Sequence, residues 1–281
     1  MEPIFGVMGM YGVARNDQGE LDPDLYMERV SNLGKKYGFV STAITLGANY
    51  FGEKARDKGF VGELKAKLEE MQLKPFTFCG GIYLSPKSGE QEESLRRTIE
   101  GLEFCAEIGS QVAMFGPRFH GRVAGEGRMR IAINLCRQLA DAAKGYGLYV
   151  GLEDYEYWIG DDFEMLFAYC DRDNLGLIND TGNWLIEGED PLMQTLRFRE
   201  RIVGVHLKDY RLEEGCWRSV ALGRGMVDIE RVIRAMWDLP QPYRVLMPTE
   251  TDLDVGSELE AQEQSLAYLR EVVDRIKGEK A

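Results

Sequence analysis

Short apolar runs along the chain alternate with longer stretches in which apolar residues recur every three or four positions. The first pattern is typical of buried parallel strands, and the second is typical of helices that pack against them. Eight strands are predicted in this way, at residues 4–10, 39–46, 74–83, 111–115, 148–153, 175–180, 202–206 and 243–249. A strict alternation of strand and helix requires a parallel sheet, and eight such units close a barrel. We therefore predict an α/β fold with a single (β/α)8 TIM-barrel domain over residues 1–281.

Local signals mark the ends of several predicted helices. Asp22 and Pro23 stand where an N-cap and a first helical turn are expected, and Gly38 follows the last apolar position of the same helix. Asp228 is expected to cap a later helix, and Gly223-Arg-Gly225 is expected to form a tight turn before it. These signals agree with the alternation of strands and helices.

Four of the predicted strands lead into a polar residue that follows an apolar run. These residues are Glu153, Asp180, His206 and Glu250. The carboxyl ends of barrel strands converge on one face, where TIM-barrel enzymes keep their chemistry. Three carboxylates and one imidazole suit Mn²⁺ or Mg²⁺ better than a structural zinc ion, which prefers sulfur and nitrogen ligands in a closed tetrahedron. The sequence therefore predicts that these four side chains bind one divalent ion.

The same four positions have plainer explanations. His206 could be a satisfied core histidine, and the three acids could be ion-paired residues at the rim of the barrel. Two observations favour the metal site. The four residues end their strands at matching positions, and His206 is one of only two histidines in the chain. Alternation along a strand places His206 and Lys208 on one face and Asp209 on the other. Lys208 is then expected to touch a substrate, and Asp209 to hold a loop or a neighbouring strand.

Composition narrows the classes of partner. The formal net charge of −13 argues against nucleic acid, whose phosphates would be repelled. No apolar run approaches the roughly 20 residues that span a bilayer, so no membrane partner is predicted and a cytoplasmic location is expected. The five cysteines include no Cys-x-x-Cys pair, which indicates reduced thiols that mostly fill the core. Assembly into a homo-oligomer stays open.

Several residues near the predicted barrel mouth are candidates for substrate contacts. The aromatic residues Tyr155 and Trp184 follow metal-bearing strands and could stack on a sugar ring, although packing between loops explains them equally well. Arg118, His120 and Arg224 are local cations in an acidic protein, and arginine suits carboxylate or phosphate. Ion pairing with nearby acids is the plainer account of these arginines. The full set of candidate substrate-binding residues is Arg118, His120, Tyr155, Asn183, Trp184 and Arg224.

Four motifs carry a resemblance to a known family. They are Gly151-Leu-Glu-Asp, Asn179-Asp-Thr-Gly-Asn183, Val205-His-Leu-Lys-Asp209 and Leu222-Gly-Arg-Gly-Met-Val-Asp228. The chain resembles the xylose isomerase-like TIM-barrel superfamily, and within it the sugar phosphate isomerase/epimerase group. The resemblance implies one divalent metal held by Glu153, Asp180, His206 and Glu250. It departs from ketose 3-epimerases after Glu153, where Asp154-Tyr-Glu-Tyr-Trp158 replaces an Asn-Arg type of motif, and two histidines are too few for the endonuclease IV branch.

The chemistry implied by this resemblance is proton abstraction beside a metal-chelated ketone. Glu153 and Glu250 are expected to be the acid/base pair, and Lys208 to stabilise the enediolate. The leading hypothesis is a metal-dependent isomerase or epimerase of a ketose or keto-sugar derivative. A lyase with the same site is the alternative: a dehydratase, a decarboxylase or a glycoside-cleaving enzyme. A catalytically idle barrel that serves as a binding subunit is a third hypothesis, and the intact set of four ligands argues against it.

Overall fold

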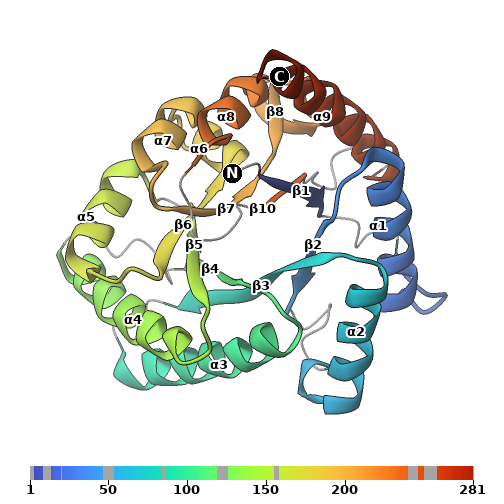
Figure 1. Cartoon of the computed structure of the whole chain (residues 1–281). Helices are drawn as coiled ribbons and strands as arrows, with labels where there is room; N and C mark the ends of the chain where they lie inside the picture. The colour runs from blue at the N-terminus through green and yellow to red at the C-terminus, as the bar shows by residue number, and fades with distance from the viewer. Residues whose placement is uncertain are drawn as a thin grey trace.

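A closed barrel of parallel strands forms the centre of the computed structural model, which describes residues 3–8, 14–19, 21–46, 54–83, 87–118, 126–154, 158–239, 246–249 and 258–280. Within these residues the strands neighbour one another in the order β1-β10-β7-β6-β5-β4-β3-β2, and the barrel closes between β2 and β1 (Figure 1). The strands are β1 (Ile4–Val7), β2 (Ser41–Thr45), β3 (Lys74–Tyr83), β4 (Val112–Arg118), β5 (Tyr149–Glu153), β6 (Leu175–Asp180), β7 (Ile202–His206) and β10 (Leu246–Thr249). The predicted TIM barrel is confirmed.

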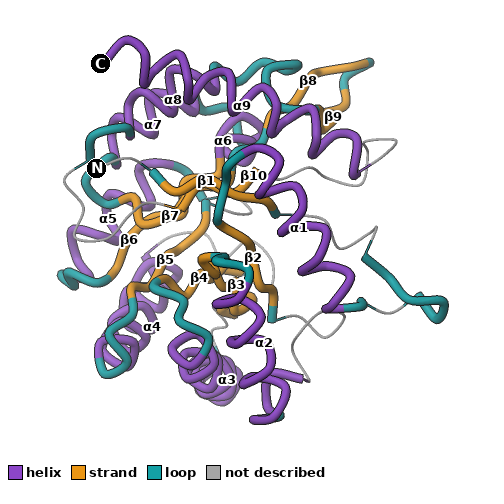
Figure 2. Tube along the Cα trace, turned by 45° about the vertical axis from the view of Figure 1, so that its right-hand side comes forward, coloured by secondary structure: helices purple, strands orange, loops and turns teal. Residues whose placement is uncertain are grey.

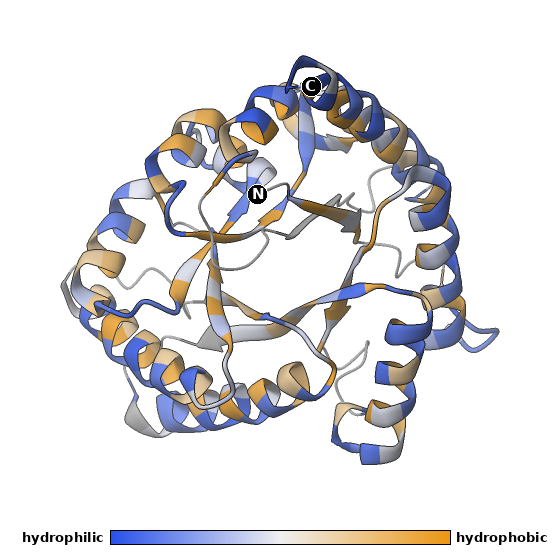
Figure 3. Cartoon of the chain, viewed as in Figure 1, coloured by the Kyte–Doolittle hydropathy of each residue, from blue (hydrophilic) through white to orange (hydrophobic). Residues whose placement is uncertain are grey.

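Helices surround this barrel as an outer ring (Figure 1). They are α1 (Pro23–Tyr37), α2 (Lys58–Glu70), α3 (Ser88–Glu107), α4 (Glu126–Lys144), α5 (Gly160–Cys170), α7 (Pro191–Phe198), α8 (Ile229–Met236) and α9 (Glu258–Lys280), with a 3-10 turn η1 at Lys54–Arg56. The helices of the ring carry both hydrophobic and hydrophilic residues, as helices with one face on the barrel must (Figure 3). Among the described residues no helix has the length and apolar character that a membrane crossing requires.

The predicted signals at helix ends are confirmed. The side chain of Asp22 accepts hydrogen bonds from the backbone N–H groups of Asp24 and Leu25, each at 3.0 Å, and caps α1. Gly38 ends the same helix in the left-handed region, with φ at 75°. Asp228 caps α8 through the N–H of Arg231. These caps fix where α1 begins and ends and where α8 begins.

Two features at the carboxyl ends of the strands were not predicted. A short helix α6 (Thr181–Ile186) starts directly at the end of β6, and an antiparallel hairpin of β8 (Asp209–Glu213) and β9 (Cys216–Val220) follows β7. The hairpin turns through Glu214 and Gly215, both with positive φ, and projects at the upper right of Figure 2. Six residues are too few to show a helical period, and a Glu-Gly turn is a weaker hairpin signal than Asn-Gly.

The barrel interior is packed with large side chains that fill space left by glycines. Phe76, Ile178 and Val203 belong to a buried cluster inside the barrel. A Cβ atom at Gly204 would lie 2.6 Å from the ring of Phe76, and one at Gly151 would lie 2.2 Å from Ile178. These strands therefore need glycine where a neighbouring or facing strand contributes a large residue. The strand-end residues lie directly above this packed interior, at the carboxyl ends of the strands.

Candidate metal centre

Three of the four predicted ligands come together at the carboxyl ends of β5, β6 and β7. Glu153, Asp180 and His206 each offer one ligand atom, and these atoms all lie within 4.8 Å of one another. His206 Nδ1 is 2.9 Å from Glu153 Oε1 and 3.5 Å from Asp180 Oδ2. All three residues are buried. The adjacency of the three strands produces this cluster, because Asp180 and His206 are register partners in neighbouring strands.

The fourth predicted ligand, Glu250, lies outside the described residues. It directly follows β10, which pairs with β1 and β7 in the closed barrel. Its role as a metal ligand and as a catalytic residue stays a prediction.

Hydrogen bonds hold both the side chain and the backbone N–H group of Asp180. Its Oδ1 accepts the N–H groups of Gly182 at 2.9 Å and Asn183 at 3.0 Å, so it caps α6. Its own N–H donates to Asp154 Oδ1 at 2.7 Å. Its Oδ2 is turned toward the cluster, 3.2 Å from Lys208 Nζ. One carboxylate oxygen of Asp180 therefore serves the fold and the other serves the site.

The charge state of Asp180 follows from these neighbours. Burial by itself would raise the pKa of this carboxyl group, but the positive charge of Lys208 and the hydrogen bond with His206 lower the pKa to about 2. Asp180 is therefore an anion throughout the neutral pH range. An anion with both oxygens engaged is suited to hold a cation and poorly suited to carry a proton to or from a substrate.

His206 and Lys208 lie on the same face, as alternation along the strand predicts. Both approach Asp180 Oδ2, His206 through Nδ1 and Lys208 through Nζ. The ring of Phe76 meets the His206 ring edge-on, with centroids 5.7 Å apart. Asp209 points the other way, as expected, and accepts N–H groups of Gly223, Gly225 and Val227 at 2.8–3.0 Å. Those three bonds hold the loop between β9 and α8.

Thr181 fixes the backbone of Lys208. Its hydroxyl donates to the carbonyl of Lys208 at 2.6 Å and accepts the N–H of Lys208 at 2.9 Å. The next residue, Gly182, has no room for a side chain, since a Cβ atom there would lie 2.8 Å from Lys208 Cβ and 2.4 Å from the Tyr210 ring. The turn from β6 to α6 thus places Asp180 and Lys208 relative to each other.

Replacing Thr181 with valine is expected to destabilise the protein while leaving its shape nearly unchanged. The exchange keeps the volume but leaves the buried N–H and C=O groups of Lys208 without their partner, at a cost of about 1–3 kcal/mol per group. Urea unfolding at neutral pH measures the loss. Thr181→Ser, which keeps the hydroxyl, is the matched control and should lose much less. Equal stability of the valine and serine variants would contradict the role assigned to the hydroxyl.

Trp184 does not lie where a substrate-binding residue was predicted. It was expected to contact a substrate, but its side chain is fully buried. The indole N–H donates to Asn179 Oδ1 at 2.8 Å, and the ring stacks on Phe198 and meets Phe163 edge-on. The short helix α6 turns the ring toward Phe163 of α5 and Phe198 of α7, where apolar area is removed from water. The packing alternative is right for this residue.

The structure describes only some of the other candidate substrate residues. Asn183 lies one turn above Asp180 at the start of α6, half-buried, and its side-chain nitrogen has no hydrogen-bond partner within the described residues. Arg224 is exposed in the loop that Asp209 anchors. Arg118 is the last residue of β4, and its side chain lies outside the described part of the structure. His120 and Tyr155 lie outside the described residues.

Asp154 is a buried acid beside the cluster that was not predicted to belong to the site. It borders the cluster and receives the N–H of Asp180. Burial, together with the negative charges of Asp180 and Glu153, raises the pKa of Asp154 well above its usual value. Two further acids within reach of Asp180 make this region short of positive charge, even with Lys208 present. Its donor set, two carboxylates and an imidazole, therefore fits a divalent cation.

Comparison with known proteins agrees with the fold. The family model described as xylose isomerase-like TIM barrel matches residues 22–272. A xylose isomerase-like TIM barrel protein from Mycobacterium smegmatis, solved in complex with magnesium, is 19% identical, with 97% of this chain and 96% of that chain covered and a TM-score of 0.71. The D-allulose 3-epimerase from Methylomonas sp. is 15% identical, with 97% and 100% covered and a TM-score of 0.74. At these identities the likeness is one of fold.

One curated relative is more similar in sequence over a shorter region. An inosose dehydratase from Lacticaseibacillus casei is 32% identical over 91 residues, which are 30% of this chain and 29% of that protein. The match thus spans less than a third of the length of the relative.

Proposed function

Because the chain belongs to the xylose isomerase-like TIM-barrel family, we propose that it is a divalent-metal-dependent isomerase or epimerase of a ketose or keto-sugar derivative. The observation that supports this most directly is the buried cluster of Glu153, Asp180 and His206, with the ammonium group of Lys208 at 3.2 Å from Asp180. An oxygen-rich cluster of this kind stands at the carboxyl ends of barrel strands, where such folds carry out their reactions.

Glu153, Asp180 and His206 would hold the ion, with Glu250 as the expected fourth ligand. Oxygen ligands in the majority favour Mn²⁺ or Mg²⁺. When bound, the ion would act as a Lewis acid toward a ketone oxygen and so raise the acidity of the neighbouring C–H group.

Proton transfer and stabilisation of the developing negative charge are assigned to the side chains around the metal position. Asp180 stays anionic with both oxygens engaged, so proton transfer is assigned to Glu153 and Glu250. Glu153 keeps only a small exposed fraction and has Oε1 at 2.9 Å from His206 Nδ1, which fixes its direction. Lys208 would donate to the sugar oxygen on which negative charge develops, since its ammonium group is already held at the site. Proton return to the opposite face of the same carbon is epimerisation, and return to the next carbon is isomerisation.

Substrate contacts are proposed for the residues around the mouth. Asn183 is the best supported of them, because its amide nitrogen lies beside the cap that Asp180 forms and has no hydrogen-bond partner among the described residues. Arg118, His120, Tyr155 and Arg224 remain proposals from the sequence. Arg118 and Arg224 would bind a carboxylate or phosphate if the sugar carries one.

A lyase is the second candidate function. The similarity to an inosose dehydratase favours it, since a dehydratase is a lyase that removes water from its substrate. The same side chains would serve, because abstraction of the proton beside the carbonyl is shared and the reactions differ only in what leaves afterward.

Incubation of the protein and Mn²⁺ with keto-sugars in heavy water separates the two functions. An isomerase or epimerase should introduce solvent deuterium at the carbon beside the carbonyl, because the abstracted proton exchanges with water. Nuclear magnetic resonance and mass spectra of the recovered sugar measure this. A dehydrated or shortened product would identify a lyase. Recovery of every tested sugar without exchange or product, in the metal-loaded protein, would contradict both.

A further inference from the structure

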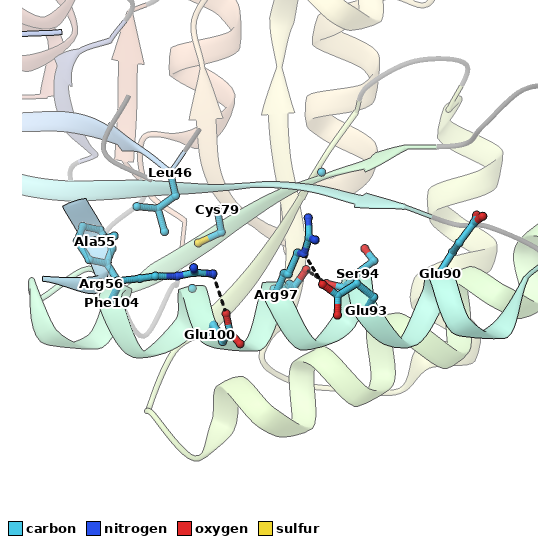
Figure 4. A pocket seen from close by; sticks show the side chains of 13 residues that line it. Leu46, Ala55, Arg56, Cys79, Glu90, Glu93, Ser94, Arg97, Glu100 and Phe104 are labelled. Atoms are coloured by element: carbon cyan, nitrogen blue, oxygen red, sulfur yellow. Dashed lines mark hydrogen bonds and ion pairs between the residues drawn. The ribbon is translucent and has the colours of Figure 1, made fainter. Parts of the chain in front are cut away.

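A cavity of about 450 Å³ lies between β3 and α3, on the outer side of the barrel wall. Its inner wall is apolar and includes Leu46, Cys79 and Phe104, and its rim is charged. Figure 4 shows Cys79 reaching toward α3, with the ion pairs Arg56–Glu100 and Arg97–Glu93 beside it. The cavity is distinct from the metal cluster, whose residues come from β5, β6 and β7.

Cys79 is paired with a second thiol at the wall of this cavity. Its Sγ is 3.1 Å from Sγ of Cys105, which lies on α3. The two residues differ in access, since Cys79 is partly exposed and lines the cavity, whereas Cys105 is fully buried behind it. A pair with one accessible and one buried sulfur has the arrangement needed for attack by the first and resolution by the second.

The backbone of β3 is shaped to present Cys79 in this way. The register between β3 and β4 shifts between Phe78 and Gly81, and Gly80 has φ at 99°, which marks a bulge at Cys79. Opposite the bulge, α3 carries Gly101, where a Cβ atom would lie 3.5 Å from Cys79 Cβ and 3.7 Å from Cys79 Sγ. The absence of a side chain at Gly101 keeps the cavity open above the thiol.

We propose that Cys79 and Cys105 are a redox modification site, at which a small-molecule disulfide that enters the cavity oxidises the two thiols to an intramolecular disulfide. The thiol of Cys79 loses its proton and attacks one sulfur of the reagent, whose S–S bond breaks and releases one thiol. The sulfur of Cys105, after losing its proton, attacks Cys79 in this mixed disulfide and releases the second thiol. The protein loses two electrons and two protons, which reduce the reagent to two thiols.

The geometry and the charges of the cavity support this reagent class. An S–S bond is about 2.05 Å long, so the two sulfur atoms need to approach by roughly 1 Å, which side-chain rotation can supply. Arg56 and Arg97 at the rim each lie beside a glutamate, so the rim offers both signs of charge to a zwitterion such as glutathione disulfide. Burial, with the hydrogen bond to Cys105, raises the pKa of the Cys79 thiol. The reaction should therefore accelerate as the pH rises.

The chain contains its own control pair. A second pair, Cys136 and Cys170, also lies close enough for each thiol to shift the pKa of the other, but both residues are buried and neither lines the cavity. Proximity alone would make both pairs react. Access through the cavity would make only Cys79 and Cys105 react.

The test uses the full chain carrying Cys216→Ser, which removes the exposed fifth thiol. The protein is incubated with glutathione disulfide at pH 8, quenched with acid and alkylated in denaturant. We expect the number of free thiols to fall from four to two, with a mass loss of two hydrogens and a peptide that links Cys79 to Cys105. Adding Cys105→Ser should stop the reaction at a glutathione adduct on Cys79. Gly101→Leu should slow the reaction by covering the thiol, and Gly101→Ala should not.

Peptide mapping of the protein with an intact pair decides the proposal even if a serine variant fails to fold. Retention of all four thiols under these conditions would overturn it. A link between Cys136 and Cys170 that forms as fast would overturn it too, because access through the cavity would then play no part. Neither result depends on the enzymatic activity, so the proposed function is tested separately.

Discussion

Glu153→Gln is expected to reduce kcat by about 1,000-fold or more, in the range over which a general base contributes. The amide has the shape of the carboxyl group, so the barrel should fold normally, but it cannot accept a proton from a carbon acid. Because Glu153 is also a proposed ligand, turnover is measured at saturating Mn²⁺, with the bound metal quantified in the same sample. Loss of kcat at full metal occupancy identifies loss of the base.

The next residue supplies the matched control for this substitution. Asp154→Asn makes the same acid-to-amide exchange at a buried position, but it keeps the Oδ1 atom that accepts the N–H of Asp180 at 2.7 Å. Its effect on kcat should be far smaller, because Asp154 is assigned no proton transfer. A Glu153→Gln variant with a rate near that of the wild type would remove Glu153 from the mechanism and leave Glu250 as the candidate base.

Removal of the metal is expected to abolish activity and to lower the melting temperature. An ion that binds only the folded protein stabilises it by about 2.7 kcal/mol at 100 times its Kd. For a chain of this size, that corresponds to a shift in Tm of about 5 °C. The physical source is the charge of the cluster, where Glu153 and Asp180 lie buried together and Asp154 is adjacent. Calorimetry after chelation, followed by addition of Mn²⁺, Mg²⁺ or Zn²⁺, measures the shift and ranks the ions.

A ligand variant shows whether the shift belongs to this site. His206→Gln removes the imidazole but keeps a polar side chain of similar size, so its folded state should respond much less to added metal. An equal Tm of the wild type in chelator and in excess Mn²⁺ would contradict a metal centre at Glu153, Asp180 and His206. If added metal raises the Tm of His206→Gln as much as that of the wild type, the ion binds at another site.

The sequence predicted much of the fold because its signals are local. Alternation of apolar runs and helical periods is set by which residues are buried, and the order of elements then permits little besides a parallel barrel. The predicted and observed bounds of β3 are the same, Lys74–Tyr83, since buried strands have sharp changes of polarity at their ends. The short helix α6 and the hairpin of β8 and β9 were missed, because their packing against the barrel end leaves no period of its own.

For the site, the sequence by itself determined which residues end neighbouring strands, and so that Glu153, Asp180 and His206 would converge. It also determined that Lys208 and Asp209 face opposite ways, because side chains on a strand alternate. Only the tertiary structure decided that Trp184 packs into the core and that Cys79 meets Cys105 on α3. The direction of a loop or helix side chain, and the contact of two residues distant in sequence, depend on how helices pack on the barrel. Packing is a property of the assembled fold, and no local pattern in the chain records it.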